Sequence, residues 1–501
     1  MPILTLKDLS FTRGLPLFSG LDLALERGAR LGLVAANGHG KSTLLRLIAG
    51  EEEPTSGEIT RARGLKIAHL RQEIPADPRP LRELVADGLG PELAEYESWR
   101  ADVALADLGF PVAAAEQPLS ALSGGWQGLA MLAAALVGEP DLLLMDEPTN
   151  HLDLARIGAL ERWVAGAAPT LIIASHDRAF LDAVTDHTLF LRPERSRSYA
   201  LPYSRALEAL EEADAAEGRR FENEMRKASA LRRQAAKLKN IGINSGSDLL
   251  LTKTKQLTER AAALEESARP AHRERGAGVI RLTNAGTHAK ALISFDETEV
   301  TAPDGRRLYR FGPAWIERGD RVVLMGPNGA GKTQLVNRVL AAIGGEDPTI
   351  RAAATLVLGH SAQDLDQIGG SGHAFDLITH RFDLGDDRAR SLLAGAGLTP
   401  EQQKAPLAAL SGGQRARLAM LVLRLIRPNF YLLDEPTNHL DIDGQKTLQE
   451  ELMEKEATCL IVSHDRSFIR TIATRLWVIE GRRLKEVDDP EPVFAGLLAE
   501  G

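Results

Sequence analysis

The pattern of apolar and polar positions predicts short strands and helices that alternate along the first 200 residues. Alternating apolar residues in Ile3–Leu6 and Leu21–Leu25 predict half-buried strands, and the apolar run Arg30–Val34 predicts a buried strand. A glycine-rich turn follows that run, and Thr43–Ala49 continues with helical spacing. From about residue 290 the pattern returns, with Arg321–Met325 before a second glycine-rich turn. The pattern predicts an α/β fold.

The segment between these two regions has a different pattern. Leu, Ala, Glu, Arg and Lys dominate from Ser204 to Lys239, and the apolar positions there follow an imperfect heptad. Asn240–Ser247 has the composition of a turn, and Leu250, Leu257, Ala261 and Leu264 resume helical spacing. We therefore expect an antiparallel helical hairpin whose first arm is roughly 50 Å long, at 1.5 Å per residue.

Five motifs occur twice in the same order. Lys332 follows Lys41 by 291 positions, and Gln363 follows Gln72 by the same interval. The later motifs are 288 positions apart, as His464 is from His176. The chain is therefore an internal duplication. We expect a first domain in residues 1–200, the helical hairpin in 201–285 and a second domain in 286–501.

Both glycine-rich turns have the composition of a phosphate-binding loop. In Gly326–Thr333 the backbone amides converge on the phosphates, Lys332 pairs with β- and γ-phosphate oxygens, and Thr333 holds Mg²⁺. The first copy has Ala35 where the pattern has glycine, which the loop tolerates if the φ of Ala35 is negative. The residues expected to bind ATP here are Asn37, Gly38, Gly40, Lys41, Ser42, Thr43, Asn328, Gly329, Gly331, Lys332, Thr333 and Gln334.

Acidic, histidine and glutamine residues complete two candidate catalytic sites. Asp146-Glu147 and Asp434-Glu435 each end an apolar strand; the aspartate is suited to organising Mg²⁺ and the glutamate to polarising the attacking water. His176 and His464 are expected to reach the γ-phosphate. Gln72 and Gln363 are expected to sense Mg²⁺ and water. The candidate metal ligands are Ser42, Gln72, Asp146, Thr333, Gln363 and Asp434.

Composition excludes several classes of protein. The single cysteine, Cys459, excludes a disulfide framework and a cysteine-ligated cluster, and its apolar neighbours predict a buried strand. We find no signal-peptide pattern at the N-terminus and no apolar run of the roughly 18 residues that a membrane helix needs, and we expect a cytoplasmic protein. The net charge is −9, yet the segment Arg219–Lys239 holds eight basic residues and two acidic ones.

Four short motifs carry a specific resemblance. Leu122–Trp126 and Leu410–Gln414 resemble the signature motif of ATP-binding cassette (ABC) proteins. Glu147–Asp153 and Glu435–Asp441 resemble the ABC-F subfamily, as does the tryptophan after the first signature. The resemblance implies two tandem ABC-type P-loop domains, the first and second cassettes, which close face to face over two ATP molecules.

The resemblance also implies how the two sites are shared between the cassettes. Site one joins the phosphate loop, Gln72, Asp146, Glu147 and His176 of the first cassette to the second signature. Site two joins the corresponding residues of the second cassette to the first signature. Asp153 and Asp441 are expected at the seam. The signature residues expected to bind ATP are Ser123, Gly124, Gly125, Ser411, Gly412 and Gly413.

Members of the resembled family bind the ribosome at the tRNA exit site, and their linker reaches toward the peptidyl-tRNA and the peptidyl-transferase centre. The basic segment Arg219–Lys239 suits an rRNA or tRNA partner, because phosphates attract Lys and Arg whatever the base sequence. We therefore expect an ATP-hydrolysing translation factor. We also expect a monomer whose cassettes pair within one chain, with no membrane domain and no DNA-binding tail.

Two departures from the family pattern stand out. The hairpins before the phosphate loops offer Phe11-Thr12-Arg13 and Ala302-Pro303-Asp304, so that only Phe11 or an arginine plane is placed to stack on adenine. Gln127-Gly128-Leu129 after the first signature lacks the arginines of Arg415-Ala416-Arg417, which predicts that site two is the weaker hydrolytic site.

Two other functions remain open from sequence. One is a fused ATPase subunit of a membrane importer, and the other is a DNA-repair or chromosome-associated cassette protein. The importer subunit would need partner membrane spans and would not need a basic hairpin. The DNA-associated class is disfavoured because zinc-binding cysteines and long coiled coils are missing. The sequence also leaves open whether a translation factor of this kind protects ribosomes from antibiotics, relieves stalled peptides or assists ribosome assembly.

Overall fold

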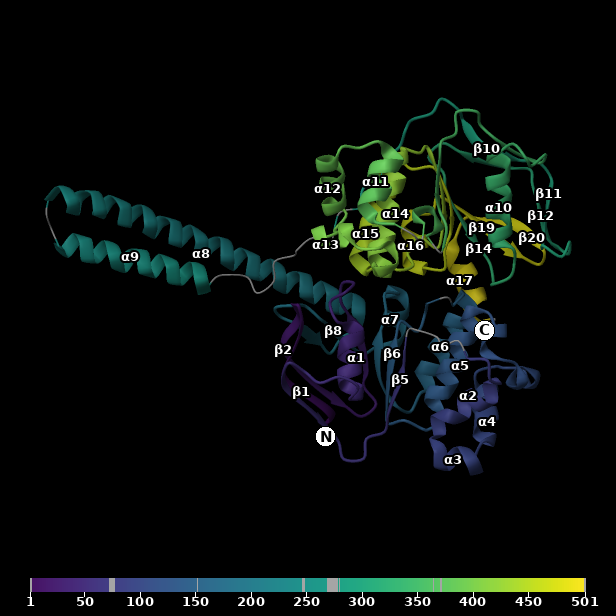
Figure 1. The fold of residues 1–501 in the computed structure, drawn as a ribbon, viewed down its shortest axis with the longest axis horizontal. Helices are drawn as coiled ribbons and strands as arrows, with labels where there is room; N and C mark the ends of the chain where they lie inside the picture. The colour runs from purple at the N-terminus through teal and green to yellow at the C-terminus, as the bar shows by residue number, and fades with distance from the viewer. Residues whose placement is uncertain are drawn as a thin grey trace.

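Two α/β bodies lie one above the other, and a long helical hairpin projects from one side of them (Figure 1). The computed structural model describes residues 2–71, 77–150, 152–245, 248–267, 278, 280–363, 365–369 and 372–499. Gln72 and the last two residues of the expected turn, Gly246 and Ser247, lie outside the described residues.

The first cassette is built on a six-stranded sheet with the order β5-β6-β7-β3-β8-β9, beside a three-stranded layer β2-β1-β4. Its strands are β1 (Pro2–Arg13), β2 (Leu15–Glu26), β3 (Arg30–Val34), β4 (Ser56–Arg61), β5 (Ile67–Leu70), β6 (Leu142–Asp146), β7 (Thr170–Ala174), β8 (His187–Phe190) and β9 (Arg197–Tyr199). The central strands β3, β6 and β7 are parallel to their neighbours and mostly apolar, as a sheet covered on both faces requires.

The second cassette repeats this core. Its main sheet has the order β11-β12-β20-β19-β14-β18-β17-β16, and the run β19-β14-β18-β17-β16 matches β8-β3-β7-β6-β5. Its strands are β10 (Ala291–Phe295), β11 (Thr298–Thr301), β12 (Arg307–Phe311), β13 (Ala314–Glu317), β14 (Arg321–Met325), β15 (Ile350–Ala352), β16 (Leu358–Ser361), β17 (Phe430–Asp434), β18 (Cys459–Val462), β19 (Arg475–Glu480) and β20 (Arg483–Val487). The matching strand order confirms the duplication.

Helices surround each sheet. Those of the first cassette are α1 (Lys41–Ala49), α2 (Leu81–Ala86), η1 (Asp87–Leu89), α3 (Pro91–Tyr96), α4 (Trp99–Asp107), η2 (Val112–Glu116), η3 (Leu119–Ala121), α5 (Gly124–Leu136), α6 (Leu154–Gly166) and α7 (Arg178–Val184). Those of the second are α10 (Lys332–Ile343), η4 (Asp366–Ile368), α11 (Ala374–Phe382), α12 (Asp386–Gly395), α13 (Pro400–Lys404), η5 (Leu407–Ala409), α14 (Gly412–Ile426), α15 (Ile442–Glu454), α16 (Arg466–Ile472) and α17 (Pro490–Ala499).

The helical hairpin consists of α8 (Tyr203–Ser245) and α9 (Asp248–Ser267), which lie antiparallel (Figure 1). Small buried residues at their seam, Ala228, Ala235 and Ala261, allow the two helices to approach closely. The expected turn at Asn240–Ser247 was placed too early, because α8 continues through Ser245. Helix extension is cooperative, so a long helix absorbs a few poor helix formers near its end.

The root of α8 belongs to the first cassette. Tyr203, Ala206 and Leu210 are buried in the core. Just beyond them, Arg192 pairs with Asp214 at 2.7 Å, which ties the next turn of α8 to the end of the first sheet. The hairpin therefore leaves the first cassette as a stiff continuation of its fold.

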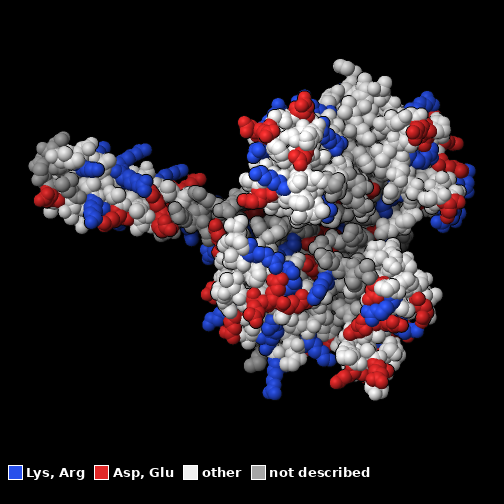
Figure 2. Space-filling model, in the orientation of Figure 1, with Lys and Arg blue, Asp and Glu red and all other residues white. Residues whose placement is uncertain are grey.

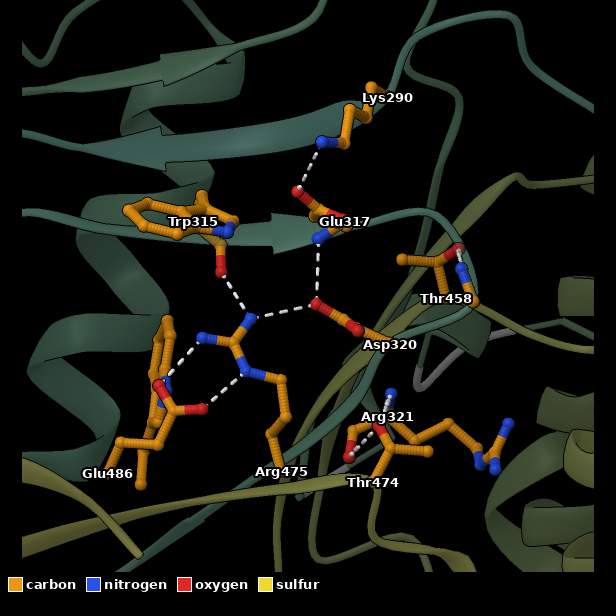
Figure 3. A network of polar contacts seen from close by, with 11 residues as sticks. Lys290, Trp315, Glu317, Asp320, Arg321, Thr458, Thr474, Arg475 and Glu486 are labelled. Atoms are coloured by element: carbon orange, nitrogen blue, oxygen red, sulfur yellow. Dashed lines mark hydrogen bonds and ion pairs between the residues drawn. The ribbon is translucent and has the colours of Figure 1, made fainter.

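A polar network fastens the β13-β10-β15 layer of the second cassette to its main sheet (Figure 3). The Arg475 guanidinium forms a two-pronged pair with Glu486 at 2.6 and 2.7 Å. It also contacts Asp320 at 2.8 Å and donates to the Trp315 carbonyl at 2.7 Å. This network lies at the amino ends of β14 and β19, which leaves the carboxyl ends of the sheet free for other chemistry.

The two cassettes share one continuous core, because a single cluster of buried apolar residues runs through both. Helix α17 of the second cassette packs on α6 of the first. Gly158 of α6 is essential to this contact, because a β-carbon there would lie 2.2 Å from the Leu498 carbonyl oxygen. Arg162 donates to the same carbonyl.

The structure also bears on the single cysteine and on the expected lack of membrane helices. Cys459 is fully buried in β18, as expected, and burial raises the pKa of its thiol to about 12. Among the described residues, we find no helix with the length and apolar character that crossing a membrane requires.

Candidate active sites

Each candidate site lies at the carboxyl edge of a sheet, where loops from three neighbouring strands meet. In the first cassette, β3 leads into the phosphate loop, β6 ends at Asp146, and β7 is followed by His176. In the second, β14, β17 and β18 supply the same three elements in the same order. The strand order thus brings together motifs that lie more than a hundred residues apart in the sequence.

The phosphate loops end in glycines that adopt left-handed backbone conformations. Gly40 has φ +90° and Gly331 has φ +102°, immediately before α1 and α10 begin. Gly326 of the second loop also has a positive φ, +156°, whereas its counterpart Ala35 is absent from the described residues with positive φ. The alanine is therefore compatible with the first loop, as the sequence required.

Lysine, glutamate and histidine form a compact buried group in the first site. Lys41 Nζ lies 3.4 Å from Glu147 Oε1, contacts His176 Nε2 and donates to the Ala35 carbonyl at 3.3 Å. The His176 amide donates to Glu147 Oε2 at 3.1 Å. These three side chains were predicted separately, and the structure brings all of them together.

In the second site the histidine amide contacts the glutamate as in the first site, but the lysine has different partners. The His464 amide donates to Glu435 Oε2 at 3.3 Å. Lys332 Nζ instead donates to the carbonyls of Gly326 and Pro327, at 2.8 and 3.1 Å. Its ammonium is held by the phosphate loop itself, ready to face a phosphate.

Both glutamates adopt a backbone conformation that is rare for any residue except glycine. The φ of Glu147 is +52° and that of Glu435 is +48°. Their amides donate to the carbonyls of Ala174 and Val462, each at 2.8 Å, across the adjacent strand. Such conformations cost of order 1–3 kcal/mol each and concentrate at functional sites. Their occurrence at equivalent positions of both cassettes favours a functional role for both carboxylates.

Burial dominates the electrostatics of these groups. It raises the pKa of Glu147 and raises that of Glu435 to about 8. Burial and the neighbouring lysines hold the pKa of His176 and His464 well below its usual range, so both imidazoles are neutral at pH 7. Burial also raises the pKa of Asp146, although a hydrogen bond from Ser42 acts in the opposite direction.

One buried carboxylate oxygen in the first site, Asp146 Oδ1, has no hydrogen-bond partner within the described chain, whereas Glu147 Oε1 lies 3.4 Å from Lys41 Nζ and from His176 Nε2. Unpaired buried oxygens are costly unless a ligand completes them. Among the described residues, no three His, Cys, Asp or Glu side chains gather as a metal site. A cation at Asp146 would therefore take its other ligands from hydroxyl, phosphate and water oxygens, a set that fits Mg²⁺.

The two cassettes contact each other at the phosphate loops. The Asn37 amide donates to Asp441 Oδ2 at 2.9 Å, and its side-chain amide donates to the His439 carbonyl at 2.8 Å. In the second site, the Asn328 amide donates to Asp153 Oδ2 at 2.9 Å. Asp153 and Asp441 thus lie at the seam, where the resemblance placed them.

One cavity of about 910 Å³ runs along this seam. Every described residue proposed as catalytic, ATP-binding or metal-binding lines it, from both cassettes. Each phosphate loop therefore shares its space with the signature of the other cassette, and Gly413 is packed directly against the Asn37 side chain. Gln363 also lines the cavity; its partner Gln72 lies outside the described residues.

One link across site two was not foreseen from sequence. The Arg156 guanidinium lies over the Trp126 ring, 4.9 Å from its centroid, and pairs with Asp153 at 3.0 Å. The first signature is thereby connected to the aspartate that holds Asn328. Beside the first signature, the arginine comes from α6 and not from the residues that directly follow the signature. Sequence spacing does not reveal this contact.

Comparison with known proteins agrees with this architecture. A family model described as "ABC transporter" matches residues 18–150 and 314–438. The chain is 33% identical to the ATP-binding protein Uup of Caulobacter vibrioides, over 96% of this chain and 78% of that protein. It is 28% identical to ATP-binding cassette sub-family F member 3 of Homo sapiens, over 97% of this chain and 72% of that protein. The chain belongs to the ABC-F family.

Further matches extend over nearly the whole ABC-F chain. The probable ATP-binding protein YheS of Escherichia coli is 30% identical over 97% of this chain and 80% of its own length. Among solved structures, the RNase-L inhibitor superposes with a TM-score of 0.64 at 18% identity, over 99% of this chain and 93% of that one. That likeness shows the fold. With two ABC ATP-binding domains and ABC-F relatives, this protein binds and hydrolyses ATP.

Proposed function

We propose that this ABC-F protein is a ribosome-associated translation factor that binds at the tRNA exit site. In this proposal its hairpin α8–α9 acts on the peptidyl-tRNA and the peptidyl-transferase centre, and ATP hydrolysis resets the complex. The protein works in the cytoplasm as a monomer with paired cassettes. Protection of ribosomes from antibiotics is one outcome of such an action.

The observation that carries this proposal is a basic segment, Arg219–Lys239, on the hairpin of an acidic ATPase. Arg226, Arg233 and Lys237 line one groove along α8. Among the described residues, Arg233 and Lys237 have no acidic partner within 4.0 Å, and Arg226 has only the exposed Glu222 at 3.8 Å. Figure 2 shows Lys and Arg side chains along the visible face of the hairpin, interspersed with Asp and Glu. Unpaired cations on a projecting arm are suited to an RNA backbone.

Similar proteins give independent support. The archaeal ribosome recycling factor aABCE1, in complex with the ribosomal stalk protein aP1, superposes with a TM-score of 0.65 at 18% identity, over 98% of this chain and 92% of that one. A protein of this fold thus binds a ribosomal protein. The hairpin described above gives the present chain a means of reaching RNA.

Residues of both cassettes would divide the chemistry at each site. Lys41 and Lys332 bind the β- and γ-phosphates, and the opposite signature serine closes over the γ-phosphate. In their ionised form Glu147 and Glu435 take a proton from the attacking water, and the neutral His176 and His464 contact the transferred phosphate. Because each site needs both cassettes, ATP binding favours their pairing.

Mg²⁺ fits these sites. Ser42 and Asp146 would hold it in site one, and Thr333 and Asp434 in site two, with Gln72 and Gln363 near its water shell. When bound, it neutralises phosphate charge that builds up during transfer. The unpaired Asp146 Oδ1 is the observation that supports this assignment.

The experiment that tests the proposal reverses the groove charges. Arg226→Glu, Arg233→Glu and Lys237→Glu together should weaken ribosome pelleting at least tenfold and flatten its salt dependence by about one unit per lost phosphate contact. ATP turnover without ribosomes should stay within about twofold, because the groove is remote from the cavity. Arg232 is left intact, since it pairs with Glu265 on α9.

A matched control separates the groove from net charge. Arg63, Arg388 and Lys404 are exposed cations on the cassettes, and reversing all three changes the total charge equally. The control should pellet as the parent does. Equal loss in both triple variants, or no loss in the groove variant, would contradict the role of the hairpin.

A further inference from the structure

A second, smaller pocket of about 280 Å³ lies in the second cassette. Its wall combines α12 and α14 with Ile280 and Arg281, which follow the hairpin in the sequence and precede β10. Gly278 packs closely on the end of α12, since a β-carbon there would lie 2.2 Å from the Ala396 carbonyl carbon. None of the residues that line this pocket also lines the ATP cavity or the groove on α8. The pocket is therefore a separate place in the fold.

The wall of this pocket carries three arginines and no acidic residue: Arg281, Arg417 and Arg424. Among the described residues, none of the three guanidinium groups has a carboxylate within 4.0 Å or donates a hydrogen bond. Arg417 Nε is buried and has no hydrogen-bond partner in the part of the chain that the structure describes. A buried, unpaired donor is costly unless a ligand or a water molecule completes it. The pocket thus holds positive charge that the surrounding protein does not neutralise.

Acceptors on the surrounding elements have other partners. The carbonyls of residues 392–394, at the end of α12, accept backbone amides that close the helix. Glu451 of α15 accepts the amide of Leu282 at 2.7 Å. Asp441 accepts the amide of Asn37 at the seam between the cassettes. None of these acceptors takes a hydrogen bond from the arginines, which leaves their N–H groups available to a ligand.

The fold does not require arginine at the two helix positions. At the interval of 288 residues, Arg417 and Arg424 of α14 correspond to Leu129 and Leu136 of α5. Leu129 is buried in the core of the first cassette, and Leu136 packs against the same core. Apolar side chains therefore satisfy this helix in the first copy of the duplication. Arginines that are only half-buried in the second copy favour a role other than packing.

We propose that this pocket binds a phosphate group, presented by an RNA backbone or by free inorganic phosphate. A planar guanidinium donates two parallel N–H···O bonds to phosphate, and bonds between charged partners are stronger than neutral ones. The volume lies just below the roughly 300–1,000 Å³ of most small-molecule sites, which suits one phosphate group better than a whole nucleotide. Both sources present the same oxygens, so both are tested below.

The position of the pocket links a bound phosphate to the ATP sites and to the hairpin. Helix α14 begins directly after Ser411 of the second signature, and Ser411 lines the ATP cavity. A phosphate held by Arg417 and Arg424 would therefore contact the signature helix of site one. Helix α12 lies on the side of the second cassette from which the hairpin projects (Figure 1). The inference rests on the pocket alone and does not depend on the proposed ribosome role.

Isothermal titration calorimetry of the whole chain with inorganic phosphate tests the free source. Two equivalents of a non-hydrolysable ATP analogue with Mg²⁺ fill both ATP sites beforehand, so that the phosphate loops do not compete. Arg417→Leu with Arg424→Leu, which introduces the residues of the first cassette, should raise the dissociation constant at least tenfold. Arg281→Gln alters no helix and should raise it at least threefold.

Fluorescence anisotropy with a labelled single-stranded RNA tests the other source. The background is the groove variant Arg226→Glu, Arg233→Glu, Lys237→Glu, so that α8 contributes little to RNA binding. In this background the double leucine substitution should weaken RNA binding at least tenfold if the pocket takes a backbone phosphate. A loss for inorganic phosphate alone identifies free phosphate as the source, and a loss for RNA identifies the RNA backbone. Either result supports the pocket as a phosphate site.

Arg388→Gln with Lys404→Gln is the matched control, because both are exposed cations of the second cassette outside the pocket and their loss changes the charge equally. It should leave both dissociation constants within about twofold. Absence of binding by the parent in both experiments, a change below threefold in the double leucine variant, or an equal loss in the control would overturn the proposal. Thermal melting checks each fold, and if the double leucine variant melts early, the response of Arg281→Gln decides.

Discussion

At the scale of single residues, the catalytic role proposed for two glutamates rests on where the backbone places them. Glu147 and Glu435 sit at the ends of fully buried strands, in left-handed conformations held by a carbonyl of the neighbouring strand. Each carboxylate receives the amide of a histidine from the next loop. These constraints aim a buried carboxylate at the position where a water molecule would attack a bound γ-phosphate.

Replacing both glutamates with glutamine should remove turnover and preserve nucleotide binding. Glutamine keeps the size and accepts the same histidine amide, yet it takes no proton from water. Loss of a general base typically lowers the rate about 100-fold or more. We expect phosphate release from the double variant to fall by that factor while a fluorescent ATP analogue still binds. Turnover at half the parent rate would exclude these residues as the bases.

Sequence predicted much of each site, because phosphate loops and Asp-Glu pairs have fixed local spacing. It did not predict the positive φ of Glu147 and Glu435, which depends on a carbonyl from another strand. Nor did it predict the contact between Arg156 and Trp126, whose α-helices meet only in the folded cassette. The weaker activity expected at site two stays a prediction.

At the scale of elements, α7 and α16 meet across the seam with a buried carboxylate at each N-terminus. Asp177 caps α7 and Asp465 caps α16, each accepting a backbone amide at 2.9 Å. Burial and the facing Asp177 raise the pKa of Asp465 to about 6, opposed by Arg178. Burial likewise raises the pKa of Asp177, opposed by Arg466, which also pairs with Glu161.

Asp465→Asn should make the stability of the protein less sensitive to pH. The folded pKa of Asp465 lies above its unfolded value of 3.8, so the native state binds the proton more tightly. Its contribution is present at low pH and is lost as pH rises through about 4 to 6. Asparagine caps α16 equally well and carries no charge. The variant should melt higher than the parent at both pH values, and its advantage should be clearly larger at pH 7.5 than at pH 5. An equal difference at both pH values would contradict this reading.

For the helical hairpin, the sequence pattern predicted both helices but not where the first helix ends. Helical spacing predicted both arms, and small residues at the seam confirm their pairing. The predicted end of α8 at Asn240 was wrong, because each turn-forming residue was considered by itself whereas helix extension is cooperative. As a result Ile241 and Ile243, expected in the turn, lie on α8 with more than half of each side chain exposed.

At the scale of the whole molecule, the duplication explains why one chain forms two sites. In each phosphate loop a backbone amide donates to the aspartate that follows the Pro-Thr-Asn-His motif of the other cassette. Helix α17 of the second cassette also packs on α6 of the first. Equal spacing predicted the two domains. The spacing could not predict that α17 packs on α6, because neither helix contains a motif that indicates which helix it packs against. The hairpin extends from the first cassette of this paired body, where the root of α8 is buried.

Ribosome pelleting of the Glu147→Gln, Glu435→Gln variant tests the central claim most directly. With ATP, this variant should keep its cassettes paired and sediment with ribosomes in near-stoichiometric amounts. With ADP, the same variant should remain largely in the supernatant, and so should the parent protein after it has consumed its ATP. If the variant binds ribosomes no better with ATP than with ADP, or sediments with membranes instead, this protein is not the ATP-gated ribosome factor described here.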